Sequence, residues 1–227
     1  MLTKTQIDKL GERLKQGSIS AQDLEWLEMY RRSFTAASES IATRIRDIIG
    51  IEPAARPLKS TTSIVDKLRR ERTRLSTMQD IAGCRITVRD ISAQNALIEA
   101  ICDALSIEDV SISIVDRREK PSHGYRAVHI IVRLFGRQVE IQVRTELLHQ
   151  WAEMCEALAD RFGTELKYGG EVGELRYTLN TISLAIADVE DPVVPVSEFG
   201  EPLRSPEFGD ALLDAMRDLI MEVRNQE

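Results

Sequence analysis

The spacing of apolar residues changes along the chain, and the change predicts where helices give way to strands. Up to about residue 74, apolar side chains recur every three or four positions, as they do on one face of a helix. This spacing predicts helices over residues 3–16, 20–49 and 60–74. From residue 84 the spacing shortens toward alternation. This alternation predicts strands over 84–88, 110–115, 125–134 and 137–144, with Phe135 and Gly136 as a hairpin turn. Residues 92–105, between the first two strands, have helical spacing instead and are predicted to form a helix.

Helical spacing returns in the C-terminal third, over residues 147–161, 173–189 and 207–223. Between the last two helices, residues 190–206 hold four of the seven prolines, so we expect a linker or an extended arm there. The sequence therefore predicts an α/β or α+β core over residues 51–170. An N-terminal helical segment, residues 1–50, is expected to pack on this core, and C-terminal helices with a proline-spaced arm follow over residues 171–227.

The composition restricts the class of protein. The 227 residues are 43% hydrophobic, which is ordinary for a domain with a buried core, and there is no run of about 18 apolar residues. The polar N-terminus does not resemble a signal peptide, so we expect a cytoplasmic protein without membrane contact. Cys84, Cys102 and Cys155 form no Cys-x-x-Cys pair. We interpret them as buried thiols rather than as disulfide or zinc ligands.

Positive charge is concentrated in one stretch of an otherwise acidic chain. The net charge is −7, yet residues 56–74 contain seven Lys or Arg residues and two acidic ones. On the predicted third helix, one face collects Ser63, Lys67, Arg70 and Arg74, and apolar residues occupy the opposite face. The pattern leaves two interpretations open: this cationic face binds an anionic ligand, or it is a solvated helix surface.

The strand over residues 137–144 carries polar side chains along one whole face. Apolar residues alternate there with Gln138, Glu140, Gln142 and Arg144. This polar face is either an ordinary solvent-facing surface or part of a site. Asp80 lies just before the strand pattern that contains Arg85, where it fits a turn or a cap. Alternatively, Asp80 and Glu140 converge on one Mg²⁺ ion, because proteins usually hold this ion with one or two carboxylates plus substrate phosphates.

A basic loop, residues 120–126, precedes the next strand pattern. Gly124 lets backbone N–H groups approach a ligand, and Lys120 and Arg126 supply positive charge, so the loop is suited to bind phosphate. Tyr125 is a candidate for stacking on a base. Basic loops are common, so this signal is weak when it is taken alone.

Four short motifs occur in a fixed order and together resemble the synthetase domain of the RelA/SpoT family over about residues 40–170. They are Asp80-Ile81-Ala82-Gly83-Cys84-Arg85, the run from His123 to His129, the run from Val139 to Thr145, and Trp151-Ala152-Glu153. The upstream spacing of Lys59, Ser63 and Lys67 is similar to the family's ATP-phosphate helix. The resemblance implies an α+β fold with a mixed five-stranded sheet flanked by helices, related to nucleotidyltransferases.

The resemblance also implies roles for individual residues. Asp80 and Glu140 would hold Mg²⁺, and Glu140 would accept the proton of the attacking 3′-hydroxyl. ATP would be bound by Lys59, Ser63 and Lys67 at its phosphates and by Arg85 at its adenine. The acceptor nucleotide would be bound by Lys120, Arg126 and His129 at its phosphates, by Tyr125 and His149 at its base, and by Gln142 and Arg144. Small family members carry a second adenine-stacking arginine where this chain has Pro57, and the nearest arginine is Arg56.

These roles imply a Mg²⁺-dependent pyrophosphokinase that transfers a pyrophosphate group from ATP to the 3′-hydroxyl of GDP or GTP, making the alarmone (p)ppGpp. An alternative keeps the chemistry but changes the acceptor to the tRNA 3′ end or to adenine nucleotides, as in toxic relatives neutralised by an antitoxin. A third hypothesis is a nucleotide-binding module without catalysis, against which the presence of both carboxylates argues. All three histidines fall within or after the synthetase motifs, with no His-Asp pair, so we expect no degradation of the product.

The last predicted helix carries an apolar stripe that must be covered. Its members are Ala211, Leu212, Ala215, Leu219 and Val223, with Leu213, Met216 and Ile220 beside them. We expect this stripe to form a homo-oligomer through the C-terminal helices. Packing on the chain's own core, or on a regulator, is left open.

Overall fold

The computed structural model describes residues 2–163, 173–190 and 206–225. The helices among them are α1 (Lys4–Gln16), α2 (Ala21–Arg32), α3 (Thr35–Ile49), α4 (Thr61–Glu71), the 3-10 turn η1 (Leu75–Thr77), α5 (Ile91–Leu105), α6 (Glu146–Phe162), α8 (Gly173–Glu190) and α9 (Pro206–Asn225). The strands are β1 (Ala54–Ala55), β2 (Ala82–Val88), β3 (Ser111–Asp116), β4 (Val128–Leu134) and β5 (Arg137–Thr145).

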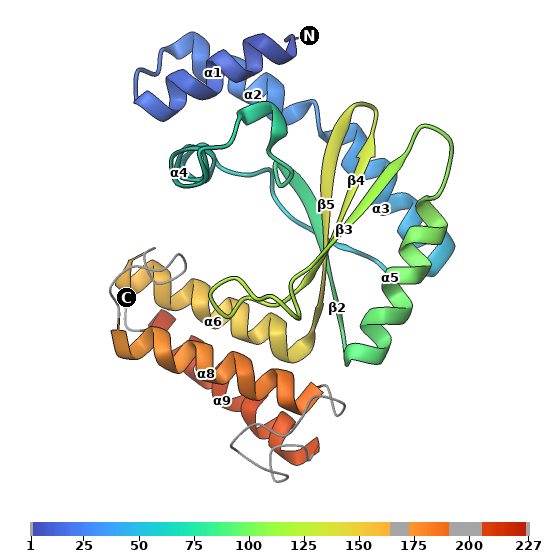
Figure 1. The fold of residues 1–227 in the computed structure, drawn as a ribbon, viewed down its shortest axis with the longest axis vertical. Coiled ribbons are helices and arrows are strands. Elements are labelled where there is room, and N and C mark those ends of the chain that lie inside the picture. The colour runs from blue at the N-terminus through green and yellow to red at the C-terminus, as the bar shows by residue number, and fades with distance from the viewer. Residues whose placement is uncertain (1, 164–172, 191–205, 226–227) are drawn as a thin grey trace. The chain divides into compact units, whose positions relative to one another are not determined.

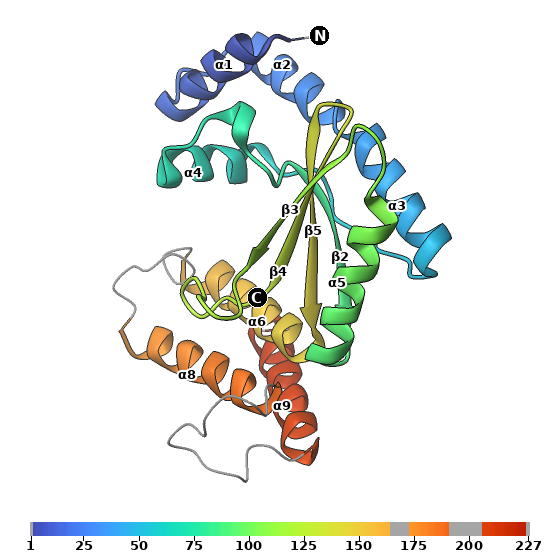
Figure 2. The same cartoon turned by 45° about the vertical axis from the view of Figure 1, so that its right-hand side comes forward.

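The strands form one mixed five-stranded sheet in the order β1-β2-β5-β4-β3, and the fold is α+β as predicted. β1 pairs antiparallel with β2, with Ala54 opposite Arg85 and Ala55 opposite Cys84. Helices α3 and α5 lie on the same side of the sheet (Figures 1 and 2). Arg44 of α3 connects them, since its Nε and Nη2 donate to the Ala104 carbonyl at 3.1 and 3.0 Å.

The chain divides into two compact units that are interleaved in sequence. The first unit comprises residues 1–86, 98–115 and 129–142, and the second comprises 87–97, 116–128 and 143–227. The domain boundaries expected after residues 50 and 170 do not coincide with this division. Each unit has its own apolar cluster and its own group of candidate site residues, so the two are described separately.

The apolar cluster of the first unit is formed by α1, α2, α4 and η1. Leu10 and Leu14 of α1, Leu27 of α2, Leu68 of α4 and Leu75 of η1 are almost completely buried in it. Helix α1 begins with a capping box, in which the Thr3 side chain accepts from the Gln6 backbone and the Gln6 side chain accepts from the Thr3 backbone. The shared apolar cluster packs the N-terminal helices α1 and α2 against α4, the helix that carries the predicted ATP-phosphate residues.

The apolar cluster of the second unit is formed by α6, α8 and α9. Trp151 of α6, Ile186 of α8, and Met216 and Ile220 of α9 are buried in it, and Leu212, Leu213 and Val223 are partly buried. One side of the stripe thus packs on its own chain, which is the alternative that the sequence left open, whereas Ala211, Ala215 and Leu219 of the same stripe are exposed. A homo-oligomer through the C-terminal helices stays a prediction, for which Leu219 and Met221 are exposed large apolar side chains of α9.

The predicted helix over residues 20–49 is wrong as a single helix, because it breaks between α2 and α3. Ser33 ends α2, with its hydroxyl donating to the Tyr30 carbonyl at 2.5 Å, and Phe34 turns inward. Phe34 then packs edge-on against the Tyr30 ring with centroids 5.1 Å apart. The break buries both aromatic rings in the first unit.

Smaller differences concern the ends of elements. Helix α4 ends at Glu71 because Arg72 has a left-handed backbone, so Arg74 lies beyond the helix and does not share its cationic face. Strand β4 starts at Val128 rather than at residue 125, because residues 122–125 form a turn. The proline-spaced arm lies mostly outside the described residues. The hairpin turn is confirmed, since Phe135 and Gly136 both have positive φ.

None of the three cysteines, all of which lie in the described ranges, forms a disulfide. Cys84 is buried, and burial raises its pKa to about 12, whereas Cys102 and Cys155 are half-buried. Over the described ranges, we find no helix with both the length and the apolar content needed to span a bilayer.

Candidate active site

The segment that follows β1 runs beside β2 and delivers two cations to two carboxylates. The Arg56 N–H donates to the Gly83 carbonyl at 3.2 Å, and the Lys59 N–H donates to the Ile81 carbonyl at 2.9 Å. These backbone bonds extend the β1–β2 pairing toward Asp80. As a result, the side chains of Arg56 and Lys59 reach the predicted metal ligands.

Asp80 is bound by two lysines on one of its oxygens. Lys59 Nζ and Lys67 Nζ each lie 3.0 Å from Asp80 Oδ2. The other oxygen, Asp80 Oδ1, is buried and has no hydrogen-bond partner among the described residues. A buried carboxylate oxygen without a donor is costly, so this atom is suited to contact a cation.

Helix α4 supplies Lys67 because Ser60 caps its first turn. The Ser60 hydroxyl accepts from the Ser63 N–H at 3.1 Å and donates to Ser63 Oγ at 2.9 Å. Ser63 is exposed in that first turn, where unpaired backbone N–H groups favour anions. Lys67 follows one turn later. Ser63 and Lys67 are therefore placed as the predicted cationic face requires. Arg70, also predicted on that face, pairs with Glu71 at 3.1 Å.

Glu140 lies at the centre of a dense polar cluster on β5. Its Oε2 accepts from Arg56 Nη1 at 3.1 Å and from Gln142 Nε2 at 2.6 Å, and its Oε1 lies 3.0 Å from His129 Nδ1. Glu140 and Gln142 are 7% and 6% exposed, and Arg144 is 4% exposed. The polar face of β5 is therefore not an ordinary solvent-facing surface. The sequence pattern alone could not exclude that alternative.

The electrostatics of Glu140 favour its charged form. Burial alone would raise its pKa, but the hydrogen bond and charge of His129, the hydrogen bond from Gln142 and the charge of Arg56 outweigh it. Together they lower the pKa of Glu140 to about 2. A carboxylate held in this way stays ionised at neutral pH, as a metal ligand must.

In the second unit, Tyr125 follows a tight turn. The Ser122 N–H donates to the Tyr125 carbonyl at 3.2 Å and the Tyr125 N–H donates back to the Ser122 carbonyl at 3.0 Å. His123 and Gly124 between them have φ values of 54° and 83°, the conformation of a type I′ turn. The Arg144 guanidinium lies 5.1 Å from the centre of the Tyr125 ring and donates to its hydroxyl at 2.9 Å. Tyr125 and Arg144 are thus brought together.

Three other candidates for the acceptor site have different surroundings. Arg126 is half-buried: its Nε donates to Ser183 Oγ at 3.2 Å and its Nη1 donates to the Arg118 carbonyl. Its pKa is lowered by burial, and the charge of Asp188 partly opposes that shift. Lys120 is exposed on the loop, and His149 is half-buried on α6. Arg126 is therefore engaged with its own chain in this structure.

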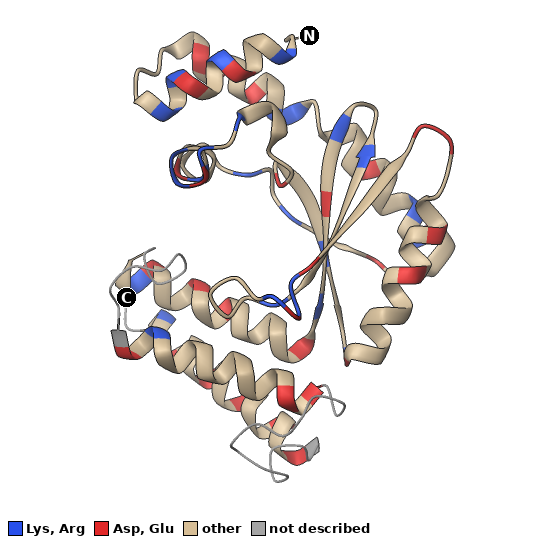
Figure 3. Ribbon diagram, viewed as in Figure 1, with Lys and Arg blue, Asp and Glu red and all other residues tan. Residues whose placement is uncertain are grey.

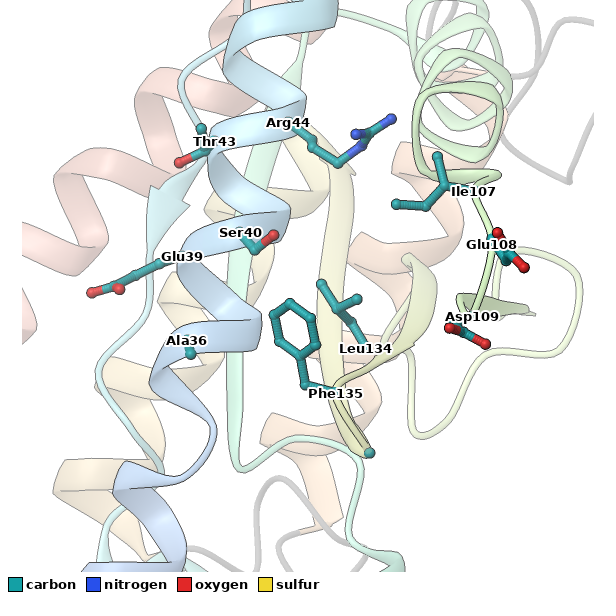
Figure 4. Close-up of a pocket in the computed structure, with 11 residues that line it drawn as sticks. Ala36, Glu39, Ser40, Thr43, Arg44, Ile107, Glu108, Asp109, Leu134 and Phe135 are labelled. Atoms are coloured by element: carbon teal, nitrogen blue, oxygen red, sulfur yellow. The ribbon is translucent and has the colours of Figure 1, made fainter.

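The predicted residues separate into two groups. The first unit collects them around two carboxylates: Arg56, His129 and Gln142 at Glu140, and Lys59 and Lys67 at Asp80. Arg85, half-buried on β2, belongs to the same unit. The second unit contains Lys120, Tyr125, Arg126, Arg144 and His149. A hollow in the first unit lies between α3, the tip of the β4–β5 hairpin and the loop after α5 (Figure 4). None of the predicted site residues of either unit lines this hollow.

Residues 56–160 match the family model described as the region found in RelA/SpoT proteins. This stretch of the chain is therefore similar to the synthetase region of RelA/SpoT proteins. An uncharacterized protein of Mycobacterium tuberculosis strain H37Rv is 41% identical over 112 residues, which are 48% of this chain and 40% of that protein. The match thus spans less than half of the relative's length.

Solved structures are similar to this chain at the level of the fold. Small alarmone synthetase 1 from Bacillus subtilis, bound to its product pppGpp, superposes with a TM-score of 0.59 at 23% identity, over 73% of this chain and 93% of that chain. Small alarmone synthetase 2 from the same organism superposes with a TM-score of 0.54 at 23% identity, over 73% and 92%. These similarities support the mixed five-stranded sheet with flanking helices.

Apart from the contacts of Arg126 with helix α8, the polar contacts of the candidate site described above lie within the matched residues 56–160. Helix α8 lies beyond residue 160, and yet Ser183 contacts Arg126. Sequence reasoning assigned no role to Ser183, Asn180 or Arg176 of this helix. Nothing in their local pattern distinguishes them from the polar positions of an ordinary amphipathic helix.

Proposed function

We propose that the protein is a pyrophosphokinase that transfers a pyrophosphate group from ATP to the 3′-hydroxyl of GDP or GTP. The observation that carries this proposal is the cluster around Asp80 and Glu140 within the stretch similar to RelA/SpoT proteins. Glu140 is buried and Asp80 is half-buried, and cationic side chains surround each of these carboxylates. Phosphoryl chemistry of this kind depends mainly on positioning and charge neutralisation, which such a cluster provides.

The carboxylates fit a Mg²⁺ ion that also binds substrate phosphates. Asp80 Oδ1 lacks a partner, and Glu140 is held ionised. Within the described ranges, no group of three or more His, Cys, Asp or Glu side chains forms a complete metal site. We therefore assign Mg²⁺ to Asp80 and Glu140, with phosphate oxygens completing its shell, as is usual for this ion. When bound, it would neutralise charge on the transferred phosphates.

The chain's own residues have separate roles in the proposed reaction. The 3′-oxygen of the acceptor forms a bond to the β-phosphorus of ATP, the bond from that phosphorus to the α–β bridging oxygen breaks, and AMP leaves. Lys59, Lys67 and the first turn of α4 would bind the ATP phosphates, and Tyr125 would stack on the acceptor base. The proton of the hydroxyl is assigned to Glu140 by resemblance. A pKa of about 2 makes that carboxylate a weak base, which favours its role in holding charge.

Arg56 has a different position from the adenine-stacking arginine of small family members. Its guanidinium donates to Glu140 at 3.1 Å, so it acts on the carboxylate in this structure. Arg85 is then the remaining candidate for stacking on adenine. We propose that Arg56 holds Glu140 in place and that ATP is bound mainly through its phosphates.

A second acceptor class is favoured by one observation. Exposed arginines continue along and beyond α4 past the residues that reach Asp80, namely Arg69, Arg70, Arg72 and Arg74. Figure 3 shows basic positions in blue on the ribbon of this helix. Such a surface suits a nucleic-acid backbone, which makes the tRNA 3′ end the competing acceptor. The net charge of −7 opposes non-specific binding of RNA.

Incubation with γ-labelled ATP and separate acceptors tests the function. The acceptors are GDP, GTP, unlabelled ATP and deacylated tRNA, each with Mg²⁺, and the Asp80→Asn variant is the control. We expect label on GDP or GTP with the wild type and none with the variant. Label on tRNA alone, or on an adenine nucleotide alone, would show that this molecule, rather than GDP or GTP, is the acceptor. Binding of ATP without transfer to any acceptor would show a non-catalytic module.

A further inference from the structure

Helix α8 presents a row of polar side chains to the turn that carries Tyr125. Arg176, Asn180 and Ser183 follow at spacings of four and three, so they share one face of the helix. The Ser183 hydroxyl donates to the Gly124 carbonyl and accepts from Arg126 Nε. One turn earlier, Asn180 lies against the same glycine.

The third member of the row contacts the other residue at the tip of the turn. Arg176 Nη2 lies 2.7 Å from His123 Nδ1. Because a guanidinium only donates, this ring nitrogen accepts the hydrogen bond. The three helix residues therefore contact three of the four residues from His123 to Arg126, all except Tyr125.

Gly124 is required for this contact on two grounds. Its φ of +83° belongs to the left-handed region that glycine adopts without strain. A Cβ atom there would also come within 2.7 Å of Asn180 Oδ1 and 3.0 Å of the Trp151 ring. Trp151 of α6 in turn donates from Nε1 to the Leu179 carbonyl of α8 at 2.9 Å. The turn is thus fitted closely against both α6 and α8.

The contact of Ser183 takes place away from solvent. Ser183 is 1% exposed, and its hydroxyl is the described side-chain partner of the Gly124 carbonyl. An alanine would fill nearly the same volume in the helix packing. The hydroxyl therefore adds a specific connection between α8 and the turn, and its removal would cost mainly that connection.

We propose that Ser183, with Arg176 and Asn180, is a set of positioning residues that holds the turn and thereby fixes Tyr125 for the acceptor base. Helix α8 would then control acceptor affinity from outside the matched RelA/SpoT region. This inference rests on the proposed function for its kinetic consequence. The contact between α8 and the turn can be tested without any activity.

The kinetic test compares Ser183→Ala and Arg176→Ala with Thr178→Ala. Thr178 is exposed on the same helix, and its hydroxyl donates to the Glu174 carbonyl within α8. We expect Ser183→Ala to raise the KM for GDP or GTP about five- to tenfold, as for loss of one buried hydrogen bond, with the KM for ATP within about twofold of wild type. Arg176→Ala should produce a smaller change of the same kind, and Thr178→Ala none.

Amide hydrogen exchange over residues 122–126 tests the contact itself. The Tyr125 N–H, which bonds to Ser122, should exchange about tenfold faster in Ser183→Ala than in Thr178→Ala. Equal increases in both KM values, or unchanged exchange over the turn in both Ser183→Ala and Arg176→Ala, would overturn the proposal. If Ser183→Ala does not fold, Arg176→Ala at the more exposed contact decides. If no acceptor is modified by the wild type, the proposed function fails, and exchange alone decides whether α8 holds the turn.

Discussion

Gly83 of β2 lies directly against the backbone of Glu140 on β5. A methyl group added at Gly83 would overlap the Glu140 carbonyl oxygen, which is backbone and cannot move aside. Gly83 has ordinary strand geometry, so the requirement for glycine here is one of space alone. The close approach places the segment that starts at Asp80 beside the strand that carries Glu140.

The overlap predicts a large effect of Gly83→Ala on stability. We expect a loss of more than about 3 kcal/mol in the free energy of unfolding, because β2 or β5 must shift. Gly136→Ala is the matched control: that glycine has open space around it and a φ of +71°, so only backbone strain of about 1 kcal/mol is expected. Urea unfolding of both variants provides the measurement. Equal losses would show that space at Gly83 is not limiting.

Asp80→Asn should abolish transfer while the fold is retained. Asp80 is half-buried at a polar position, and the amide keeps its shape but not its charge. We expect a rate lower by about three orders of magnitude or more at saturating Mg²⁺, because charge neutralisation dominates such reactions. Asp66→Asn, at an exposed position of α4, should leave the rate unchanged. Near-normal transfer by Asp80→Asn would remove this residue from the metal site.

Two substitutions of Tyr125 separate stacking from hydrogen bonding. Tyr125→Ala should raise the acceptor KM about ten- to a hundredfold, since stacking on a base contributes about 1–3 kcal/mol, with the KM for ATP little changed. Tyr125→Phe keeps the ring and loses the hydroxyl that accepts from Arg144, so a much smaller effect is expected. Steady-state kinetics with each substrate varied in turn would measure both. A Tyr125→Phe variant as impaired as Tyr125→Ala would contradict stacking as the main role.

Glu190 predicts a pH dependence of stability. Burial raises the pKa of Glu190 from 4.5 to about 7. The charge of Asp90 adds to this shift, and a hydrogen bond from Thr145 opposes it. The pKa of Glu190 is higher in the folded protein than in the unfolded chain, so folding favours the protonated carboxyl. The contribution of Glu190 to the free energy of unfolding is therefore fully present below pH 4.5 and is lost as the pH rises through 7. The wild type should therefore lose about 2–3 kcal/mol from this group between pH 4.5 and pH 8.

Unfolding of Glu190→Gln at pH 5 and pH 8 tests that dependence. The variant should lack the loss, so that its stability relative to wild type increases with pH. Glu174→Gln, an exposed position at the start of the same helix, is the control and should follow the wild type. Parallel curves for wild type and Glu190→Gln would show that Glu190 does not titrate in the folded protein near pH 7.

Helix α9 allows stability and assembly to be tested separately. Met216 is 2% exposed and Met221 is 63% exposed. Met216→Ala should destabilise the protein by about 2–5 kcal/mol through loss of core packing. Met221→Glu should leave the unfolding midpoint unchanged and lower the oligomeric state, if α9 forms the predicted homo-oligomer. Size-exclusion chromatography with light scattering at tens of micromolar decides, and a wild type that is monomeric there would exclude the homo-oligomer.

The sequence predicted most elements of the fold because their local patterns are strong. The alternation over β5 and the turn residues Phe135 and Gly136 predicted the strand and the hairpin that the structure contains. The break at Ser33 and Phe34 could not be predicted, because neither residue is a glycine or proline. It follows from the burial of Phe34 against Tyr30, a tertiary contact that no local pattern contains.

The site was predictable to a similar extent. Alternation placed Glu140 and Gln142 on one face of β5, but the same pattern also fitted a solvent-facing strand. Their burial and the convergence of Arg56 and His129 depend on segments that are distant in sequence. The contact of Ser183 with the turn joins residues 57 to 59 positions apart, in a helix without a motif, so only the structure could find it.

The interleaving of the two compact units has a consequence for fragment design. The chain passes from one unit to the other within β2, within α5, at the end of β3, at the start of β4 and within β5. No single cut therefore releases either unit as a continuous polypeptide. Reporter insertions, split-protein halves and circular permutants should tolerate new chain ends only at surface turns within one unit, such as Phe135-Gly136. A fragment ending inside β5 would instead leave both units incomplete, so deletion series across residues 87–143 should yield insoluble products rather than a minimal catalytic piece.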